Sequence, residues 1–467
     1  MKKEQKDQQK ENAEKRKNNI PMSESSLDKI ISLCKRRGFI FQSSEIYGGF
    51  GAVYDYGPLG VELKNNISQL WWKCMTQNHE NILGLDSGIL MHPKIWEASG
   101  HVDAFNDPLV DCKQCKARYR ADELVNEDFL NAKWGEIQCL KCGTTGNLTD
   151  PRQFNLMFKT SIGPVESDSD IAYLRPETAQ GIYVNYLLVQ GSMRQKLPFG
   201  IAQIGKAFRN EIIARNFIFR TREFEQMEMQ YFVKPGNDDD AMLEWKNKRF
   251  NFYIDELGVN KEKLRFQEHG KDELAHYAKE AWDIEYEFPF GWSEVEGIHN
   301  RTDFDLQRHQ EFSGKNMQYS DQLLNEKYFP FIIETSAGLN RMLLTILCDA
   351  YWDDSENKRI VMKIHPKLAP VKAVVCPLVK KDGLPEIGHG IVDNLMDSFK
   401  VLYDQQGSIG KRYYRQDEAG TPFCITVDHE SKENNTVTLR NRDDQKQDRV
   451  PINDLKKIIQ NRMESYE

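Results

Sequence analysis

The chain has 467 residues, of which 39% are hydrophobic and 29% charged, so it can bury a substantial core and is expected to divide into two or three domains. Neither a secretory signal nor a membrane span is predicted, because the N-terminus is polar and the most apolar stretch, 329–347, is interrupted by Glu334, Asn340 and Arg341. The net charge of −8 argues against a surface built wholly for nucleic acid, but it leaves room for one basic face.

The N-terminal region divides into a charged leader and two helical segments. Residues 1–21 are almost all Lys, Glu, Gln, Asn and Asp, too polar to bury a core, so we expect a disordered leader. Residues 23–40 predict a capped helix. A glycine-rich loop follows, and then a second helix with Leu63, Ile67 and Leu70 at helical spacing.

Four of the nine cysteines form two CxxC pairs in an insert at about 112–148. The pairs Cys112/Cys115 and Cys139/Cys142 are separated by 23 residues, a spacing that suits a tetrahedral zinc site closed by four thiolates. We therefore predict a structural Zn²⁺, reduced cysteines and a cytoplasmic location. The alternative is four reduced thiols with no metal.

The stretch 219–231 alternates with a period of two, as a half-buried strand does. One face carries cations, a ring, amides and an acid: Arg220, Arg222, Phe224, Gln226, Glu228 and Gln230. The other face carries Thr221, Glu223, Glu225, Met227, Met229 and Tyr231. Residues 201–211 alternate more loosely, with Arg209 and Glu211 in the same parity. Two such strands joined by a charged loop predict a β-hairpin.

Three further segments follow the hairpin. Residues 237–283 are charged and predict a helical insertion. Residues 291–306 return to strand and loop. The stretch 329–347 predicts a strand, a tight Ser-Ala-Gly turn and a helix that starts near Leu339.

The composition changes after Pro366 and Pro370, which mark a linker. An apolar strand is expected at 371–378, as in a parallel sheet. It is followed by a helix, two strands and a last helix, which predicts a compact α/β domain over 365–467. The expected helix carries Ile391, Leu395, Phe399 and Leu402, the two strands lie near 424–427 and 436–439, and the last helix starts at Pro451.

Several stretches together resemble a known family. "FRNE" at 208–211, "FRTREFEQMEM" at 219–229 and "ETSAGLNR" at 334–341 resemble motifs 2 and 3 of the class II aminoacyl-tRNA synthetases. With "RPETAQG" at 175–181 and "GWSEVEGIHNRTDFDL" at 291–306, the chain is similar to the glycyl-tRNA synthetases of the single-chain, homodimeric type. The resemblance extends from about Ser26 to Ile459.

The resemblance implies a fold and an activity. The expected fold is an α+β class II catalytic core over 22–364, an antiparallel sheet flanked by helices, with a C-terminal α/β anticodon-binding domain over 365–467. The expected activity is ATP-dependent attachment of glycine to tRNA(Gly) through a glycyl-adenylate, in a homodimer that needs no membrane. A class II enzyme for serine, threonine or proline is one alternative, and a non-catalytic tRNA-binding relative is another.

Nucleotide chemistry agrees with this resemblance. The α-phosphate needs a cation where charge builds during attack by a carboxylate, and Arg209 suits that role because its guanidinium can bind phosphate oxygens in pairs. Adenine needs flat partners on its two faces, which Phe224 and Arg341 can supply. The resemblance gives catalytic roles to Arg209 and Arg341. The ATP contacts expected from the resemblance are Arg209, Asn210, Glu211, Phe219, Arg220, Thr221, Arg222, Glu223, Phe224, Glu294, Val295, Gly338, Leu339, Asn340 and Arg341.

Glycine offers an ammonium and a carboxylate but no side chain. Three acids, Glu177, Glu228 and Glu334, suit the ammonium, Arg301 suits the carboxylate, and crowding excludes larger amino acids. Mg²⁺ bound with ATP is expected, and Glu294 and Glu334 are its candidate ligands. The full set implied for glycine is Arg120, Glu177, Phe224, Glu225, Gln226, Met227, Glu228, Arg301, Glu334, Thr335, Ser336, Ala337 and Gly338.

Two positions depart from the family pattern, and one motif is weakly marked. Thr335 stands where the family usually has proline, and Asn340 where it often has aspartate. The motif 1 helix and strand are expected near Asp86–Val102, with Pro93 as the motif proline.

Two basic segments are candidates for RNA contact. In "IGKRYYRQDEAG", Lys411, Arg412, Tyr413 and Arg415 place cations beside rings, which suits single-stranded anticodon bases; a solvated basic strand edge is the alternative. Arg118 and Arg120, beside the CxxC pairs, indicate an insert that faces RNA or a substrate; a solvated pair of arginines is the alternative.

Overall fold

The computed structural model describes residues 24–125, 129–163, 170–212, 215–270, 274 and 278–466. The leader expected at 1–21 lies outside these ranges. The described chain forms two units, each with its own sheet and hydrophobic core. None of the helices described is long and apolar enough to cross a membrane.

The larger unit is built on a seven-stranded sheet of order β11-β12-β13-β16-β10-β9-β3. All neighbouring strands are antiparallel except β3 and β9, which run parallel. This is the antiparallel sheet that the sequence predicted. Its strands are β3 (Ile82–Gly84), β9 (Phe199–Phe208), β10 (Glu223–Val233), β11 (Leu264–Glu268), β12 (Glu280–Phe288), β13 (Gly291–Thr302) and β16 (Phe331–Gly338).

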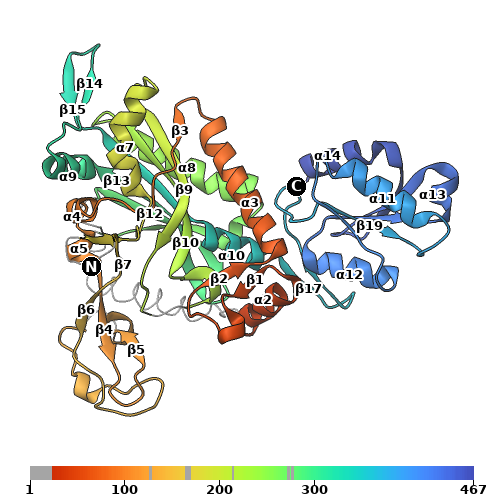
Figure 1. The fold of residues 1–467 in the computed structure, drawn as a ribbon, viewed down its shortest axis with the longest axis horizontal. Helices are drawn as coiled ribbons and strands as arrows, with labels where there is room; N and C mark the ends of the chain where they lie inside the picture. Colours follow the sequence, from red (N-terminus) through yellow and green to blue (C-terminus); the bar gives the residue numbers. More distant parts are fainter. Residues whose placement is uncertain are drawn as a thin grey trace, which may run out of the picture.

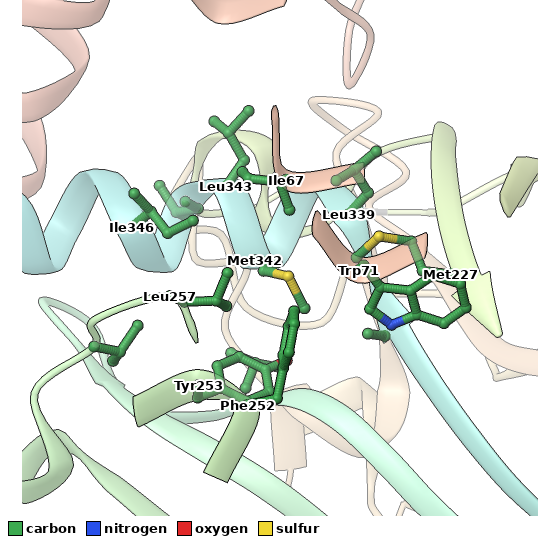
Figure 2. Packing of buried hydrophobic residues seen from close by; sticks show 14 of the residues in the cluster. Ile67, Trp71, Met227, Phe252, Tyr253, Leu257, Leu339, Met342, Leu343 and Ile346 are labelled. Carbon is green, nitrogen blue, oxygen red and sulfur yellow. The ribbon is translucent and has the colours of Figure 1, made fainter. Parts of the chain in front are cut away.

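One face of this sheet is covered by four helices, α2 (Glu24–Arg37), α3 (Pro58–Trp72), α8 (Asp238–Asn251) and α10 (Leu339–Ala350). The predicted helical spacing is confirmed, since Leu63 and Ile67 are fully buried on α3. Figure 2 shows Ile67 and Trp71 of α3 beside Met227 of β10 and Met342 of α10. These contacts bury large apolar side chains, which drives the helices onto the sheet.

The opposite face of the sheet is only partly covered. Two helices, α7 (Ala179–Ser192) and α9 (Phe304–Ser313), pack against Phe199, Phe232 and Ile332 at one end. Two short helices, α4 (Lys94–Ala98) and α5 (His101–Ala104), lie near α9 and β6 respectively.

Two expectations for this unit need correction. The insertion over 237–283 is helical only in its first half, because β11 pairs with β12 and extends the main sheet. The motif 1 pair is also misplaced: between Asp86 and Val102 the described backbone holds Pro93, α4 and the start of α5, but no ladder strand. The long helix followed by a sheet strand is instead α3 with β3.

The cysteine insert is a small separate layer, drawn in orange in Figure 1. Its three-stranded sheet, β5-β4-β6, has a core that includes Val110, Trp134 and Leu148. Its elements are β4 (Asn106–Asp111), β5 (Arg118–Arg120), α6 (Ala121–Val125) and β6 (Arg152–Asn155).

Four two-stranded hairpins complete the larger unit. They are β1 (Ile40–Gln42) with β2 (Tyr54–Tyr56), β7 (Lys159–Ser161) with β8 (Ile171–Tyr173), β14 (Tyr319–Asp321) with β15 (Glu326–Tyr328), and β17 (Tyr351–Asp354) with β18 (Arg359–Met362).

The C-terminal unit, blue in Figure 1, has a five-stranded sheet of order β20-β19-β21-β22-β23. β19, β20 and β21 run parallel, as predicted for an α/β domain, and β22 and β23 are antiparallel. The helix expected to reach Leu402 ends at Leu395, and Leu402 lies on β20. The elements are β19 (Ala373–Pro377), α11 (Leu384–Leu395), β20 (Val401–Tyr403), α12 (Ile409–Ala419), β21 (Phe423–Val427), α13 (His429–Asn434), β22 (Thr436–Asn441), β23 (Gln447–Pro451) and α14 (Leu455–Glu464).

A buried ionic network joins the two units. Arg359 of β18 donates to Asp354 at 2.8 Å and to Asp417 of α12 at 2.7 Å. Arg440 of β22 holds both oxygens of the same Asp417 at 2.8 and 2.9 Å. Arg442 donates to the main-chain oxygens of residues 364 and 420. Charges this deeply buried are stable only when each is paired, so the network fixes one arrangement of its members.

Candidate functional site

A pocket of about 210 Å³ opens on the sheet face that α7 and α9 leave uncovered. Its floor comes from β10, β13 and β16, and its rim from the β9–β10 hairpin turn. Charged and polar side chains dominate its wall. The lining residues are Glu177, Arg209, Glu211, Ile218, Phe219, Arg220, Thr221, Phe224, Gln226, Glu228, Glu294, Gly297, His299, Arg301, Glu334, Ser336, Gly338, Asn340 and Arg341.

The hairpin predicted from alternation is confirmed. The two strands are paired from Phe199 of β9 opposite Phe232 of β10 to Phe208 opposite Glu223. On β10 the side chains of Phe224, Gln226 and Glu228 line the pocket, while Met227 between them belongs to the core on the other face.

A β-bulge on β13 places four residues on the pocket face of the sheet. In a regular strand these four residues would not all lie on one face. The pairing with β12 shifts at Val295, since Glu296 pairs with Ile284 and Glu294 with the next residue, Glu285. An extra residue in one strand reverses the facing of everything beyond it. Glu294 before the bulge therefore lines the same pocket as three residues after it, Gly297, His299 and Arg301.

Glu334 on β16 is buried and held by three donors. Gln230 Nε2 donates to its Oε1 at 2.8 Å, and His299 Nδ1 donates to its Oε2 at 2.8 Å. Arg301 Nη1 lies 3.2 Å from Oε2. Burial alone would raise the pKa of Glu334, but Arg301 and His299 overcome this and lower it to about 2. Glu334 is therefore a carboxylate with little capacity for another ligand.

Glu228 on β10 differs from Glu334 in its partners. Its Oε1 accepts from Ser336 Oγ at 2.8 Å, whereas its buried Oε2 has no hydrogen-bond partner among the described residues. Burial raises the pKa of Glu228 to about 8, the nearby charges of Glu334 and Glu177 add to the effect, and the hydroxyls of Thr178 and Ser336 oppose it. An unpartnered oxygen in this environment invites a cationic ligand.

Glu177, the third acid, comes from the segment before α7. Gln180 Nε2 donates to its Oε1 at 3.0 Å, and His101 Nε2 lies 3.5 Å from its Oε2. Burial would raise its pKa, but His101 holds the pKa of Glu177 well below the usual range.

Two arginines frame the other end of the pocket. Arg209, just after β9, donates to the carbonyl of Pro176 at 3.1 Å, and its guanidinium lies 5.3 Å from the ring of Phe224. Arg341, in the first turn of α10, lies 4.4 Å over Phe219 and pairs with the carboxylate of Glu294 at 2.9 Å. Each cation therefore lies beside an aromatic ring at this end of the pocket, as groups that bind a flat ligand do.

Several residues predicted for the site have side chains elsewhere. Met227, Val295, Ala337 and Leu339 are in the core and Thr335 is fully buried on the same face, so they can reach the pocket only through their backbone. This corrects the expectation of side-chain contacts there.

The other residues that were predicted for the site but do not line the pocket have partners elsewhere. Glu223 and Glu225 bind Lys206 and Lys64, which directs their carboxylates away from the pocket. Arg222 donates to main-chain oxygens of Gly51 and Glu211, and the backbone N–H of Asn210 donates to the carbonyl oxygen of Leu156. Arg120 pairs with Asp107 and Asp122 in the insert. None of these belongs to the pocket lining.

Three lining residues were not predicted, namely Ile218, Gly297 and His299. His299 shares the parity of Arg301 on β13, and this alternation could have revealed it. Gly297 is required beside it, because a Cβ there would lie 2.9 Å from the His299 ring.

The four predicted cysteines come together in the insert. The sulfur atoms of four cysteines all lie within 4.8 Å of one another: Cys112, Cys115, Cys139 and Cys142. Hydrogen bonding to Tyr119, the largest contribution, lowers the pKa of Cys139 to about 6, which favours a thiolate. Four cysteine sulfurs at these distances can hold a metal ion.

The predicted RNA segment of the C-terminal unit is a helix, α12, rather than a strand edge. Lys411 is exposed on it. Arg412 is buried and donates to the carbonyls of Pro377 and Gly407. Tyr413 is hydrogen bonded to Thr426, and Arg415 pairs with Asp404 at 2.6 Å. The buried Arg412 is therefore a structural residue, which corrects its assignment to an RNA surface.

Comparison with known proteins adds two domain matches. The family described as "tRNA synthetase class II core domain (G, H, P, S and T)" matches residues 158–350, which contain most of the pocket. The family described as "Anticodon binding domain" matches residues 372–462, the C-terminal unit.

Curated relatives cover nearly the whole chain. A protein named glycine–tRNA ligase from Treponema denticola is 60% identical over 449 residues, covering 94% of this chain and 98% of its own length. Proteins of the same name from Borrelia hermsii and Chlorobaculum tepidum are 56% and 51% identical. They cover 94% and 91% of this chain, and 98% and 97% of their own lengths.

Proposed function

The chain belongs to the family of glycine–tRNA ligases, class II aminoacyl-tRNA synthetases that use ATP to attach glycine to tRNA, and from this we propose how its residues divide that work. In the chemistry of this family the glycine carboxylate attacks the α-phosphorus of ATP. Pyrophosphate leaves and glycyl-adenylate forms. A ribose hydroxyl at the 3′ end of tRNA then attacks the glycyl carbonyl, and AMP leaves.

We propose that Glu228 is the principal ligand of the glycine ammonium. The observation that carries this assignment is its buried Oε2, which has no protein partner in the described chain. Glu334 is already held by Gln230, His299 and Arg301, and Glu177 by Gln180. These two acids would add negative potential rather than a vacant oxygen.

Arg301 takes a different role from the one first expected. It donates to both oxygens of Asp305, at 2.9 and 3.1 Å, as well as to Glu334. We propose that it orients Glu334 and does not bind the glycine carboxylate. That carboxylate would instead point toward the arginine end of the pocket, where the α-phosphate is expected.

For ATP, we propose that Arg209 binds the α-phosphate and that adenine lies between Phe224 and Arg341. The guanidinium of Arg209 would stabilise the charge that grows on the phosphate oxygens during attack. Mg²⁺ that accompanies ATP would find its candidate ligand in Glu294, whose side chain is 45% exposed, rather than in the engaged Glu334.

We propose that the cysteine cluster holds one Zn²⁺, since its four sulfur donors suit a closed tetrahedral site. Such a site would stabilise the insert and take no part in the reaction. Because it needs reduced cysteines, it also supports the expected cytoplasmic location.

For the larger assembly, we propose a homodimer whose subunits each have a catalytic domain over residues 22–364 and an anticodon-binding domain over 365–467. On α12, Lys411 is the cation whose exposure supports contact with tRNA. Light scattering at micromolar concentration tests the dimer, which requires a mass twice that of the chain.

Amino-acid-dependent exchange of pyrophosphate into ATP, measured with each of the twenty amino acids in turn, tests the proposed chemistry. Exchange with glycine alone is expected. Exchange with serine, threonine or proline at a comparable rate would contradict the assignment of the pocket.

A further inference from the structure

The cysteine insert contacts the rim of the pocket through the carboxylate of Glu123. Glu123, on α6, accepts from Arg220 Nη1 at 3.1 Å, and its other oxygen lies 2.9 Å from Arg215 Nη2. Both arginines come from the β9–β10 turn, where they face each other in an isolated antiparallel bridge. One carboxylate of the insert therefore holds two guanidiniums of the hairpin.

Glu123 is itself held by a second ionic contact within the insert. Arg120 Nε lies 3.8 Å from Glu123. Arg120 in turn is paired with Asp107 at 3.0 Å and Asp122 at 2.7 Å. Asp107 is buried on β4, and the side chain of Glu123 is only 26% exposed. The contact between Glu123 and the two arginines of the turn is thus part of a connected network of ion pairs rather than an isolated surface pair.

Arg220 belongs to the pocket lining, but Glu123 does not. Among the partners of Glu123, Arg220 is the one that lines the pocket, so it offers a direct route by which the acid can affect a ligand. Two neighbouring arginines without an acid between them would repel each other, and each has many rotamers. An acid that orders Arg220 in advance lowers the entropy lost when that guanidinium binds an anion.

We propose that Glu123 is a positioning residue for the ATP triphosphate, acting by holding Arg220 at the rim of the pocket. The inference rests on the proposed function, in which the phosphates lie at this end beside Arg209. It gives the insert a part in nucleotide binding that the cysteine cluster alone does not explain.

The test measures the KM for ATP and kcat in pyrophosphate exchange for Glu123→Gln, which keeps the shape of the side chain and removes its charge. We expect the KM for ATP to rise about fivefold, with kcat and the KM for glycine unchanged, as when an ordered binding side chain loses its support. The matched control is Glu136→Gln, on the same insert, whose side chain is 73% exposed and pairs only with Lys133 among the described contacts.

Arg220→Ala and the double variant separate the possible failures. Arg220→Ala should raise the KM for ATP, and adding Glu123→Gln should raise it no further, because the acid acts through the arginine. An effect of Arg220→Ala without any effect of Glu123→Gln overturns the inference and leaves the proposed function standing. No effect of Arg220→Ala refutes the ATP role of the arginine itself.

Two other results would also overturn the inference. A fall in the KM for ATP in Glu123→Gln would mean that the carboxylate competes with phosphate for Arg220. In a separate assay of tRNA charging, a rise in the KM for tRNA with the KM for ATP unchanged would assign the contact to the acceptor end. Melting temperatures equal to that of the unaltered protein confirm that each variant is folded.

Discussion

Ser336 and Glu228 meet across the β10–β16 pair, where the serine hydroxyl donates to one carboxylate oxygen at 2.8 Å and leaves the other without a partner among the described residues. We predict that Glu228→Gln raises the KM for glycine or lowers kcat, by about 2 kcal/mol in transition-state free energy, because a charge-assisted hydrogen bond becomes a neutral one. Alanine should still be refused, since the volume of the pocket is kept. Activation of alanine, or full activity with glycine, would show that the pocket is wrongly assigned.

The raised pKa of Glu228 predicts a pH dependence. With a pKa of about 8 in the empty pocket, Glu228 is mostly protonated at pH 7, and the glycine ammonium favours its ionised form. Binding should therefore release a proton, and the KM for glycine should fall as the pH rises from about 6 to about 8. Calorimetry in buffers of different ionisation enthalpy measures the released proton. In Glu228→Gln this release should disappear.

Arg209 and Arg341 should affect different kinetic constants. Arg209→Ala should lower the exchange rate on the order of 100-fold or more, because a donor aimed at developing charge is lost. Arg341→Ala should act mainly on the KM for ATP, through the lost stacking partner. The control is Arg118→Ala, an exposed arginine of the insert paired with Asp111. Normal exchange in Arg209→Ala would place the α-phosphate elsewhere.

Elemental analysis should find about one zinc per chain, since the insert offers one four-sulfur site. Cys139→Ser should release this metal and increase hydrogen exchange within residues 112–148, while the main sheet keeps its protection. Cys74→Ser, which alters a cysteine outside the cluster, should retain the metal. A metal-free protein whose insert is equally protected would contradict the prediction.

Adjacent residues of α12 should respond differently to truncation. Lys411→Ala should weaken tRNA binding and leave the free energy of unfolding unchanged, because the side chain is exposed. Arg412→Ala should instead lower the free energy of unfolding by about 1–3 kcal/mol, since the carbonyls of Pro377 and Gly407 lose their buried donor. Chemical denaturation and tRNA titration distinguish the two. A stable Arg412→Ala protein with weak tRNA binding would restore the original assignment.

The strands of the pocket could be predicted where their alternation is regular. On β10 the parity of Phe224, Gln226 and Glu228 is enough to place all three on one face, as the structure confirms. On β13 the same reasoning fails, because the extra residue at Val295 reverses the parity between Glu294 and His299. A bulge depends on the partner strand, so the sequence of β13 alone does not reveal it.

Burial was the other limit of prediction. Arg412 and Lys411 are neighbouring cations in a basic, tyrosine-containing segment, and composition treats them alike. Their difference arises because one helix face packs on β19 and the other does not. Such a choice is made by tertiary packing, which overrides the local pattern.

The buried ions around Asp417 have a mechanical consequence. Arg359 of the larger unit pairs with Asp417 of the smaller unit, which Arg440 also holds, so a movement of one unit against the other would leave Arg359 without this buried partner. With the proposed tRNA contacts on α12, we expect this seam to hold α12 and the pocket at a constant distance from each other. The enzyme should then select a tRNA by the distance between its anticodon and its 3′ end as well as by its bases. We expect a tRNA whose stem is shortened by one base pair to be charged more slowly, even with every contacted base unchanged.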